Sequence, residues 1–361
     1  MNETIKINPI TYLTWSWMKI NNDTISVNLN LCENKGTELH IPDGVTVTEG
    51  KQIKTELPEP QYSIGNEAAK LISDNAKDGK IYTISGVLKE PLIIRLESPD
   101  GVNECTQQII HALPSSKGEV IIISSSEDKN AGGMTALHTK VFLEENAELK
   151  LSKVQLLGSA MNQIDESSIT CGADSKMQLI LIELGGSHVD TGFHATLYGN
   201  RSDFQSHMGY LCKKEQYLDT NQTVVHKGKK TSCNMFTDGT IRDKSTKVYR
   251  GTIDMVTGCS GSVGNEMEYT LNLSPDAVEK SAPIILCGED DISAEHGSTV
   301  GKLSKDILFY FQSHGINQAL AEELLSKAKI TAAAVKIGDE AVQKEIEEYL
   351  KKIYGTEDSE E

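Results

Sequence analysis

A lone histidine, His296, lies in the C-terminal third of the chain, where strand-like sequence gives way to helix-like sequence. Gly297 and Ser298 follow it, which predicts a Gly-containing turn, and the acidic trio 289–291 precedes it. An imidazole nitrogen is a good borderline ligand that titrates near neutral pH, so it could ligate iron or hold a proton. A structural histidine that caps the end of a β domain is the alternative. The residue type alone leaves both interpretations open.

Other residues of catalytic type give weaker signals. The acidic trio could supply paired carboxylates, as in β-helix enzymes that cleave polysaccharides, but a solvated turn explains it more simply. Nothing in the chain resembles a Walker phosphate loop, so we expect no nucleotide hydrolysis by this chain itself. Four further histidines lack the short spacings of a metal cluster and are predicted to be surface or core residues: His188, His194, His207 and His226.

The seven cysteines are widely spread and include no Cys-x-x-Cys pair. An odd number with this spacing fits neither a disulfide framework nor a structural zinc site. We therefore expect mostly buried thiols and no stable cofactor in the isolated chain. The residues are Cys32, Cys105, Cys171, Cys212, Cys233, Cys259 and Cys287.

The net charge of −17 argues against nucleic acid or an anionic membrane surface as the main partner. The one compact basic run, at residues 227–230, is too short to reverse this repulsion. No apolar run reaches the roughly 20 residues of a membrane-spanning helix, and the N-terminus lacks the apolar region of a signal peptide. These features predict a cytoplasmic protein.

The N-terminal region contains both tryptophans, Trp15 and Trp17, within a dense apolar stretch. This stretch is predicted to dock on the body as a peripheral segment held by the two aromatics, in preference to forming an aromatic ligand box. Short strands and loops are expected up to about Pro60, followed by a short helix at residues 66–72.

From about Ile81 to Leu286 the chain shows short apolar or alternating runs broken by Gly, Asn, Asp and Ser, which predicts an all-β domain. A weak echo links residues 146–158 with residues 172–185. A period of this size fits one coil of a solenoid, in which each coil buries its inner side chains against its neighbours. A sandwich of hairpins would give similar local sequence, so periodicity alone leaves both architectures open.

Three helices are predicted after Gly301. Ser304 is a good N-cap for a helix at residues 305–313, with Gly315 as its C-terminal stop. Asn317 and Asp339 can cap a second and a third amphipathic helix. The acidic stretch at residues 355–361 is predicted to be a disordered tail.

The order of several motifs from about Phe193 to Leu325 resembles the SufB/SufD family of iron–sulfur cluster assembly proteins. No single piece is diagnostic, but their shared order is. The pieces are Asp219, His226 and Ser232; Asp238-Gly-Thr; Tyr249-Arg-Gly-Thr-Ile-Asp254; Leu273-Ser-Pro-Asp-Ala277; Ala282-Pro-Ile284; Asp290-Asp291 with His296-Gly-Ser-Thr; Leu308-Phe-Tyr-Phe311; and His314-Gly-Ile316.

Two positions favour the SufD branch. In SufB-like proteins a cysteine lies 28 residues before the equivalent of His296 and a glutamate follows that histidine, whereas this chain has Glu268 and Gly297. Some positions depart even from SufD-like sequences: Ala294 stands where a cysteine is frequent, and His314 where an Arg is usual. The first weakens any role for a thiolate of this chain in cluster ligation, and the second affects the details of ATPase docking.

The resemblance implies a mainly β fold: a right-handed parallel β-helix core at residues 79–302, an N-terminal flanking region at 1–78 and a small C-terminal α-helical domain at 303–361. It also implies a non-enzymatic scaffold subunit that pairs with a SufB-like subunit and a SufC-like ABC ATPase and receives sulfur from a donor system. His296 would serve cluster assembly at the subunit interface, as a metal ligand shared with the partner, while the cluster itself would be transient. The implied ATPase contacts are Leu308, Phe309, Phe311, Gly315, Ile316, Leu320 and Leu324.

Two alternatives remain. A minimal homodimeric scaffold of the same family could act with the ATPase alone, without a SufB-like partner. A carbohydrate-active β-helix enzyme is the third hypothesis, from another class of protein. The sulfur donor, cluster type, electron source and stoichiometry are not encoded in any motif of the sequence.

Overall fold

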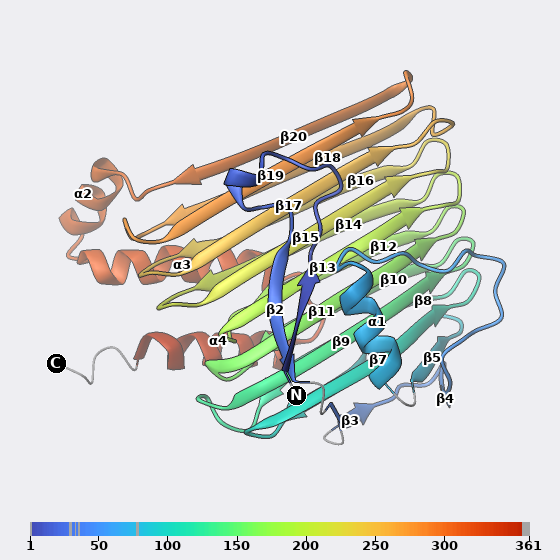
Figure 1. The fold of residues 1–361 in the computed structure, drawn as a ribbon, viewed down its shortest axis with the longest axis horizontal. Helices are drawn as coiled ribbons and strands as arrows, with labels where there is room; N and C mark the ends of the chain where they lie inside the picture. Colours follow the sequence, from blue (N-terminus) through green and yellow to red (C-terminus); the bar gives the residue numbers. More distant parts are fainter. Residues whose placement is uncertain (1, 29–30, 33, 35–36, 77–78, 356–361) are drawn as a thin grey trace.

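The chain winds into a parallel β-solenoid whose coils stack along one axis (Figure 1). The structure, a computed structural model, describes residues 2–28, 31–32, 34, 37–76 and 79–355. Each coil contributes one strand to each of two nine-stranded sheets, because the neighbours in a sheet are every second strand of the sequence. The predicted mainly β fold with a parallel β-helix core is thereby confirmed.

The two sheets are named here by their strands in spatial order. Sheet 1 contains β20 (Ile292–Gly301), β18 (Ser262–Asn272), β16 (Ser232–Ile241), β14 (Asp203–Cys212), β12 (Lys176–Glu183), β10 (Glu148–Leu156), β8 (Lys117–Ser126), β6 (Leu92–Ser98) and β3 (Thr37–His40). Sheet 2 contains β19 (Val278–Cys287), β17 (Thr246–Met255), β15 (Tyr217–His226), β13 (His188–Leu197), β11 (Ala160–Cys171), β9 (Gly132–Leu143), β7 (Val102–Ala112), β5 (Lys80–Ile84) and β4 (Val45–Glu49).

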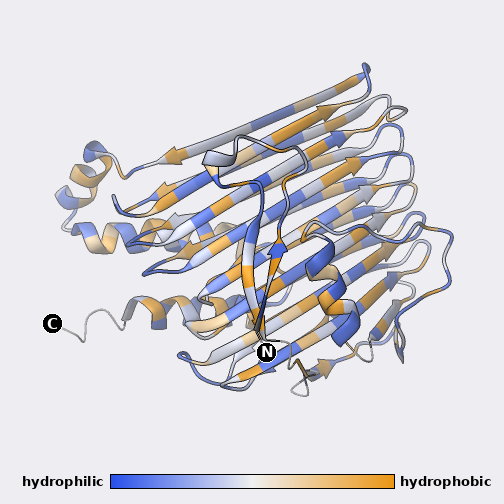
Figure 2. Cartoon of the chain, viewed as in Figure 1, coloured by the Kyte–Doolittle hydropathy of each residue, from blue (hydrophilic) through white to orange (hydrophobic). Residues whose placement is uncertain are grey.

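The two echoing segments of the sequence lie on adjacent coils. Leu149 of β10 pairs with Met177 of β12, and Leu151 with Leu179. All four side chains are buried in the main hydrophobic core between the two sheets. Apolar and polar residues alternate along many strands (Figure 2), as expected where one face of each strand points inward. The solenoid interpretation is therefore correct and the sandwich interpretation is not.

A corner of successive coils is formed by non-glycine residues in the left-handed conformation. Asn146, Asp174 and Arg201 have φ values of 59°, 57° and 58°. Each donates its backbone N–H to a carbonyl of the next coil, as Asn146 does to Ala173. Asn and Asp tolerate this conformation better than most residues, which explains the polar breaks between the apolar runs.

The two ends of the solenoid differ. At the first end, the short strands β3 and β4 pair antiparallel with β6 and β5, so the parallel stack ends there in reversed edge strands of four and five residues. At the other end, β20 and β19 are the last strands of their sheets among the described residues. An end strand carries unpaired backbone groups along its free edge.

Helices and a hairpin cover the outer faces of both sheets. Apolar residues of α3 and α4, such as Ile330 and Ile346, pack on sheet 1 residues such as Ile180. The hairpin of β1 and β2, together with α1, packs on sheet 2. The remaining elements are β1 (Asn2–Ile7), η1 (Ser16–Met18), β2 (Asp23–Asn28), α1 (Asn66–Asn75), α2 (Lys305–Ser313), α3 (Gln318–Ala334) and α4 (Glu340–Gly355).

The N-terminal segment docks on the body, but not through its tryptophans. Trp15 and Trp17 are 72% and 71% exposed and contact each other, with ring centroids 6.0 Å apart. Ile10 and Ile20 are the buried contacts of this segment, beside Val248 and other apolar residues of sheet 2. The prediction that the two aromatics hold the segment is wrong, because the smaller aliphatic residues on either side of them fill the available contact.

The predicted helices are confirmed. Ser304 Oγ accepts the backbone N–H of Ile307, and Asn317 Oδ1 accepts that of Leu320. The domain boundaries at 78 and 302 remain predictions, and the predicted acidic tail lies outside the described residues from position 356 onward. Among the described residues, no helix is both long and apolar enough to cross a membrane. Five cysteines are buried, while Cys32 and Cys287 are exposed.

Candidate functional site

His296 lies in the middle of β20, the last strand of sheet 1, and its side chain is exposed. The predicted Gly-containing turn is wrong, because β20 pairs with β18 along its whole length. The small residues that suggest a turn instead fit a close-packed strand. A Cβ atom on Gly297 would stand 3.0 Å from Met267 Sδ, so glycine lets β20 lie close to β18.

The strand register places His296 in the inward-facing row of β20. It pairs with Glu266, and Ser298 pairs with Glu268. Paired residues of parallel strands point to the same side of the sheet, and both glutamates are buried inside the coil. No further coil covers this row among the described residues, so the imidazole is exposed at the open end of the solenoid interior.

Glu268 stands at the position where the family resemblance implies a cysteine in SufB-like proteins. Its buried carboxylate forms an ion pair with Lys247 and accepts a hydrogen bond from Ser281, and Ser298 Oγ donates to its Oε2 at 2.7 Å. Lys247 also contacts Glu279 at 3.0 Å. Glu268 therefore joins the last strands of both sheets and offers no thiolate.

Glu266 is the buried neighbour of His296. Burial raises the pKa of Glu266 to about 7, and the nearby Tyr249 opposes this rise. Its carboxylate is directed at Gly251 across the coil, where any Cβ would collide with Oε1. Glu266 can therefore hold a proton near neutral pH in the strand next to the exposed His296.

The seven residues predicted to bind an ATPase lie on α2, on α3 and in the connection between them. Phe309 is 72% exposed, Leu320 and Leu324 are also exposed, while Leu308 and Phe311 are half-buried. No residue of α2 is fully buried, so this helix packs weakly against the rest of the chain. Gly315 has a φ of +77°, which ends α2, and Ile316 is half-buried beside it. The structure thus groups these residues on one helical pair that follows β20.

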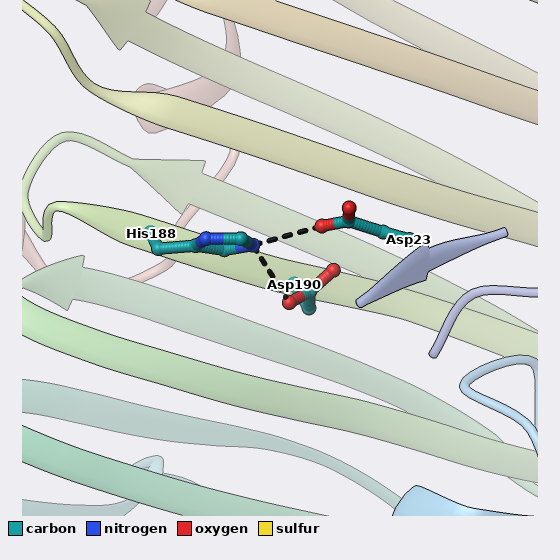
Figure 3. Close-up of side chains that lie close together, drawn as sticks. All are labelled: Asp23, His188 and Asp190. Atoms are coloured by element: carbon teal, nitrogen blue, oxygen red, sulfur yellow. Dashed lines mark hydrogen bonds and ion pairs between the residues drawn. The ribbon is translucent and has the colours of Figure 1, made fainter. Parts of the chain in front are cut away.

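A second polar cluster lies on the outer face of sheet 2, where β2 crosses β13 (Figure 3). His188 Nε2 is 2.8 Å from Asp23 Oδ2 and 3.2 Å from Asp190 Oδ2. Among the described residues this is the one group of three His, Cys, Asp or Glu side chains placed to hold a metal ion. The sequence spacing around His188 does not predict this grouping, which the fold brings together from separate parts of the chain.

The cluster continues into a buried network beneath the N-terminal segment. Asn8 Nδ2 donates to Asp190 Oδ1 at 3.3 Å and to Asp219 Oδ1 at 2.9 Å. Arg250 forms an ion pair with Asp219, and its Nε donates to the carbonyl of Ile20 at 2.6 Å. Burial and the charge of Asp219 raise the pKa of Asp190 to about 7, against the opposing effect of the histidine.

His188 itself favours its charged form in this network. Burial opposes the charge, but hydrogen bonds and the charges of Asp190 and Asp23 outweigh it and raise the pKa of His188 to about 10. One local signal could have revealed His188 and Asp190 together: residues 188 and 190 are two apart in a strand, so their side chains lie on the same face. Asp23 comes from a distant part of the sequence, and no local pattern could have revealed it.

The remaining residues of catalytic type have structural partners. Asp291 Oδ2 accepts a hydrogen bond from Ser260 Oγ at 2.7 Å, and Glu289 accepts the N–H of Gly258, so the acidic trio ties one surface turn to the previous coil. His226 is buried between Thr231 and Cys233, and His194 is also buried. These residues form no second site with paired catalytic carboxylates.

The stacked coils, the open end at His296 and the flanking helices define a parallel β-solenoid protein with polar residues exposed at one end. The model of the SUF system FeS cluster assembly SufBD core domain matches residues 95–329, more than half of the chain, and the chain belongs to this family.

Curated relatives agree with this family. The chain is 23% identical over 209 residues to the iron–sulfur cluster assembly protein SufD of Bacillus subtilis (strain 168), covering 58% of this chain and 48% of that protein. It is 23% identical over 219 residues to protein ABCI7, chloroplastic, of Arabidopsis thaliana, covering 60% and 46%. It is 24% identical over 189 residues to the SufBD family protein slr0074 of Synechocystis, covering 50% and 39%. The chain spans less than half the length of each of these relatives.

Proposed function

We propose that this chain is a SufD-like subunit of the SUF iron–sulfur cluster assembly scaffold, which pairs with a SufB-like subunit and acts with a SufC-like ABC ATPase. Family membership and the similarity to a protein named SufD support this assignment. The observation that carries it is the position of His296, exposed in the inward-facing row of the last strand at the open end. The cluster is cargo of this scaffold.

The proposed assembly site is half a site on this chain. His296 supplies an imidazole, and Glu266 lies beneath it as a carboxyl able to hold a proton near neutral pH. Glu268 is tied to Lys247, so the thiolate that iron–sulfur clusters favour would come from the partner subunit. A partner strand placed against β20 would bring such a thiolate to the imidazole.

The proposed ATPase contact lies on α2 and α3. Exposed apolar residues on an amphipathic helix are typical of helix-in-groove recognition. Phe309, Leu320 and Leu324 supply such residues, and they lie on the segment that directly follows β20. An ATPase bound here would therefore contact the segment that directly follows the strand carrying His296.

The test of the assembly role uses His296→Ala in the complex reconstituted with its SufB-like and SufC-like partners. We expect cluster formation, followed by visible absorbance and by iron and sulfide content, to be abolished while the mass of the complex is unchanged, since one interface side chain seldom carries association alone. The matched control is His40→Ala, an exposed histidine of β3 at the opposite end. Wild-type cluster formation by His296→Ala would make the histidine structural.

A companion measurement separates the two scaffold forms. The heterodimer predicts that the isolated chain retains no stoichiometric cluster and gains one only with the SufB-like subunit. A cluster retained by a dimer of this chain alone would instead establish the homodimeric scaffold. Native mass spectrometry with iron and sulfide analysis of the same anaerobic sample distinguishes these outcomes.

A further inference from the structure

One ring nitrogen faces two carboxylates in the cluster of Figure 3. His188 Nε2 lies 2.8 Å from Asp23 Oδ2 and 3.2 Å from Asp190 Oδ2. A ring nitrogen carries at most one hydrogen, which lies in the ring plane and can satisfy only one of the two oxygens well. Asp190 Oδ2 is buried and accepts no hydrogen bond of good geometry from the described residues.

Around the cluster, carboxyl groups outnumber the cationic side chains. Three carboxylates converge there, from Asp23, Asp190 and Asp219. The cations are Arg250, which is bound to Asp219, and His188 when protonated. Buried carboxylates without full compensation are costly, so the group as a whole favours an added positive charge.

We propose that Asp23, His188 and Asp190 form a binding site for one divalent transition-metal ion, Zn²⁺ or Fe²⁺. The three ligand atoms all lie within 4.8 Å of one another. Metal–ligand bonds of about 2.0–2.2 Å, at angles from octahedral to tetrahedral, place neighbouring ligand atoms about 2.8–3.6 Å apart, and the two distances from Nε2 fall in this range. One nitrogen and two carboxylate oxygens suit a borderline ion better than Mg²⁺ or Ca²⁺, which prefer oxygen ligands alone.

An ion at this place resolves the shortage of hydrogens. It takes the position of the imidazole proton and contacts both carboxylates at once, which one N–H cannot do. Three protein ligands also leave a coordination position for water or another donor. The site goes beyond the proposed assembly function, because it lies on the outer face of sheet 2 and His296 lies in the last strand of sheet 1.

The ion would fasten the N-terminal hairpin to the solenoid. Asp23 begins β2, whereas His188 and Asp190 lie at the start of β13. A site built from two separate parts of a chain forms only when they are docked, so binding stabilises the docked state. Metal should therefore raise the melting temperature of the folded chain.

The test starts from metal-free protein in which the exposed Cys32 and Cys287 are replaced by Ser, so that surface thiols do not bind the probe. Zn²⁺, Fe²⁺ under anaerobic conditions, and Mg²⁺ are titrated separately by calorimetry. We expect one Zn²⁺ or Fe²⁺ per chain, no comparable Mg²⁺ binding, and a raised melting temperature with the bound ion. The Zn²⁺ and Fe²⁺ titrations show which ion the site prefers.

Two substitutions identify the ligands: Asp190→Asn and, at the less buried carboxylate, Asp23→Asn. Each should weaken binding at least tenfold, since loss of even an outer-shell partner costs about 10–100-fold in metal affinity. The matched control is His111→Gln, which breaks a histidine–glutamate contact of 2.9 Å that has only one carboxylate. Absence of stoichiometric binding in the parent protein, or equal affinity in both Asp variants and the parent, would overturn the site.

Discussion

Glu268 makes structural contacts at a position that could otherwise carry a reactive side chain. Its carboxylate contacts Lys247, Ser281 and Ser298, which come from β17, β19 and β20. These contacts hold together the last coil, where the family resemblance implies a cysteine in SufB-like proteins. Restoring that thiol would therefore remove a buried ion pair at the edge that carries His296.

We expect Glu268→Cys to lower the free energy of unfolding by about 3 kcal/mol, because removing one partner of a buried pair is strongly destabilising. Glu279 still contacts Lys247 and limits the loss. Urea denaturation followed by circular dichroism measures the change. Glu148→Cys, at an exposed ion pair with Lys117 and Lys176, should change stability little. An equally stable Glu268→Cys protein would contradict a structural role for this carboxylate.

Glu183 predicts a pH dependence of stability. Burial, helped by the charge of Asp165, raises the pKa of Glu183 from 4.5 to about 8. The native state then keeps a proton between these pH values that the unfolded state has lost, so this residue lowers stability as pH rises through the window. Glu183→Gln removes the penalty and can still accept from Thr191. The stability gain of the variant should therefore grow from pH 4.5 to 8, by up to about 1.4 kcal/mol per pH unit.

Denaturant unfolding at several pH values across this window tests the prediction. Glu347→Gln, on the exposed face of α4, serves as the control and should follow the wild-type curve. Parallel stability curves for Glu183→Gln and the wild type would show that the native carboxyl is already ionised.

Sequence reasoning worked for single residues when their partners are local. The caps Ser304 and Asn317 each bind an N–H three residues ahead, so a short window contained the whole interaction. Asp23 and His188 could not be paired in this way, because the contact depends on where the N-terminal hairpin docks. The exposure of Trp15 could not be predicted either, because it also depends on how the N-terminal segment docks on the body.

At the scale of elements, α2 and α3 differ in how they are attached. The end of α3 buries Ile330, Ala333 and Ala334 against sheet 1, whereas α2 has no buried residue. Deleting both helices would expose the apolar face of sheet 1, so point substitutions on their exposed sides are the cleaner test of partner binding.

Phe309→Ser combined with Leu320→Ser should weaken capture of a SufC-like ATPase in a pull-down, because both side chains are exposed and apolar on the proposed contact. The melting temperature should hardly change, since neither residue is buried. Val335→Ser, just past the end of α3 and 57% exposed, is the control. Undiminished capture by the double variant would remove the ATPase contact from these helices.

The solenoid itself was only partly readable from the sequence. Alternating apolar runs and one echo indicated stacked coils, because each coil repeats the same inward-facing pattern. The choice over a sandwich came from the family resemblance. The sequence predicts a turn in place of β20 because Gly297 and Ser298 have low strand propensity, while the pairing of β20 with β18 is a non-local property.

At the scale of the molecule, the open end predicts where a second subunit binds. Val300 is half exposed in the inward-facing row of β20. Val300→Lys should weaken association with a SufB-like subunit at least about tenfold, because an unpaired charge buried at an interface is costly. Sedimentation or calorimetry measures the affinity, and Val87→Lys, near the opposite end, should bind normally. Equal affinity for both variants would place the subunit interface elsewhere.

The reversed strands β3 and β4 limit how many copies can join by stacking sheet on sheet. A solenoid with two matching open ends has a valence of two and can add units without limit, as in a fibre. β3 and β4 are edge strands too, but they span only four and five residues against ten in each of β19 and β20, and very short edge strands offer little for another chain to pair with. The effective valence then falls to one. When two open ends pair, each occupies the free edge of the other, so growth stops at a dimer whether the second chain is identical or different. The small antiparallel strands at the start of the chain thus act as a chain terminator for assembly.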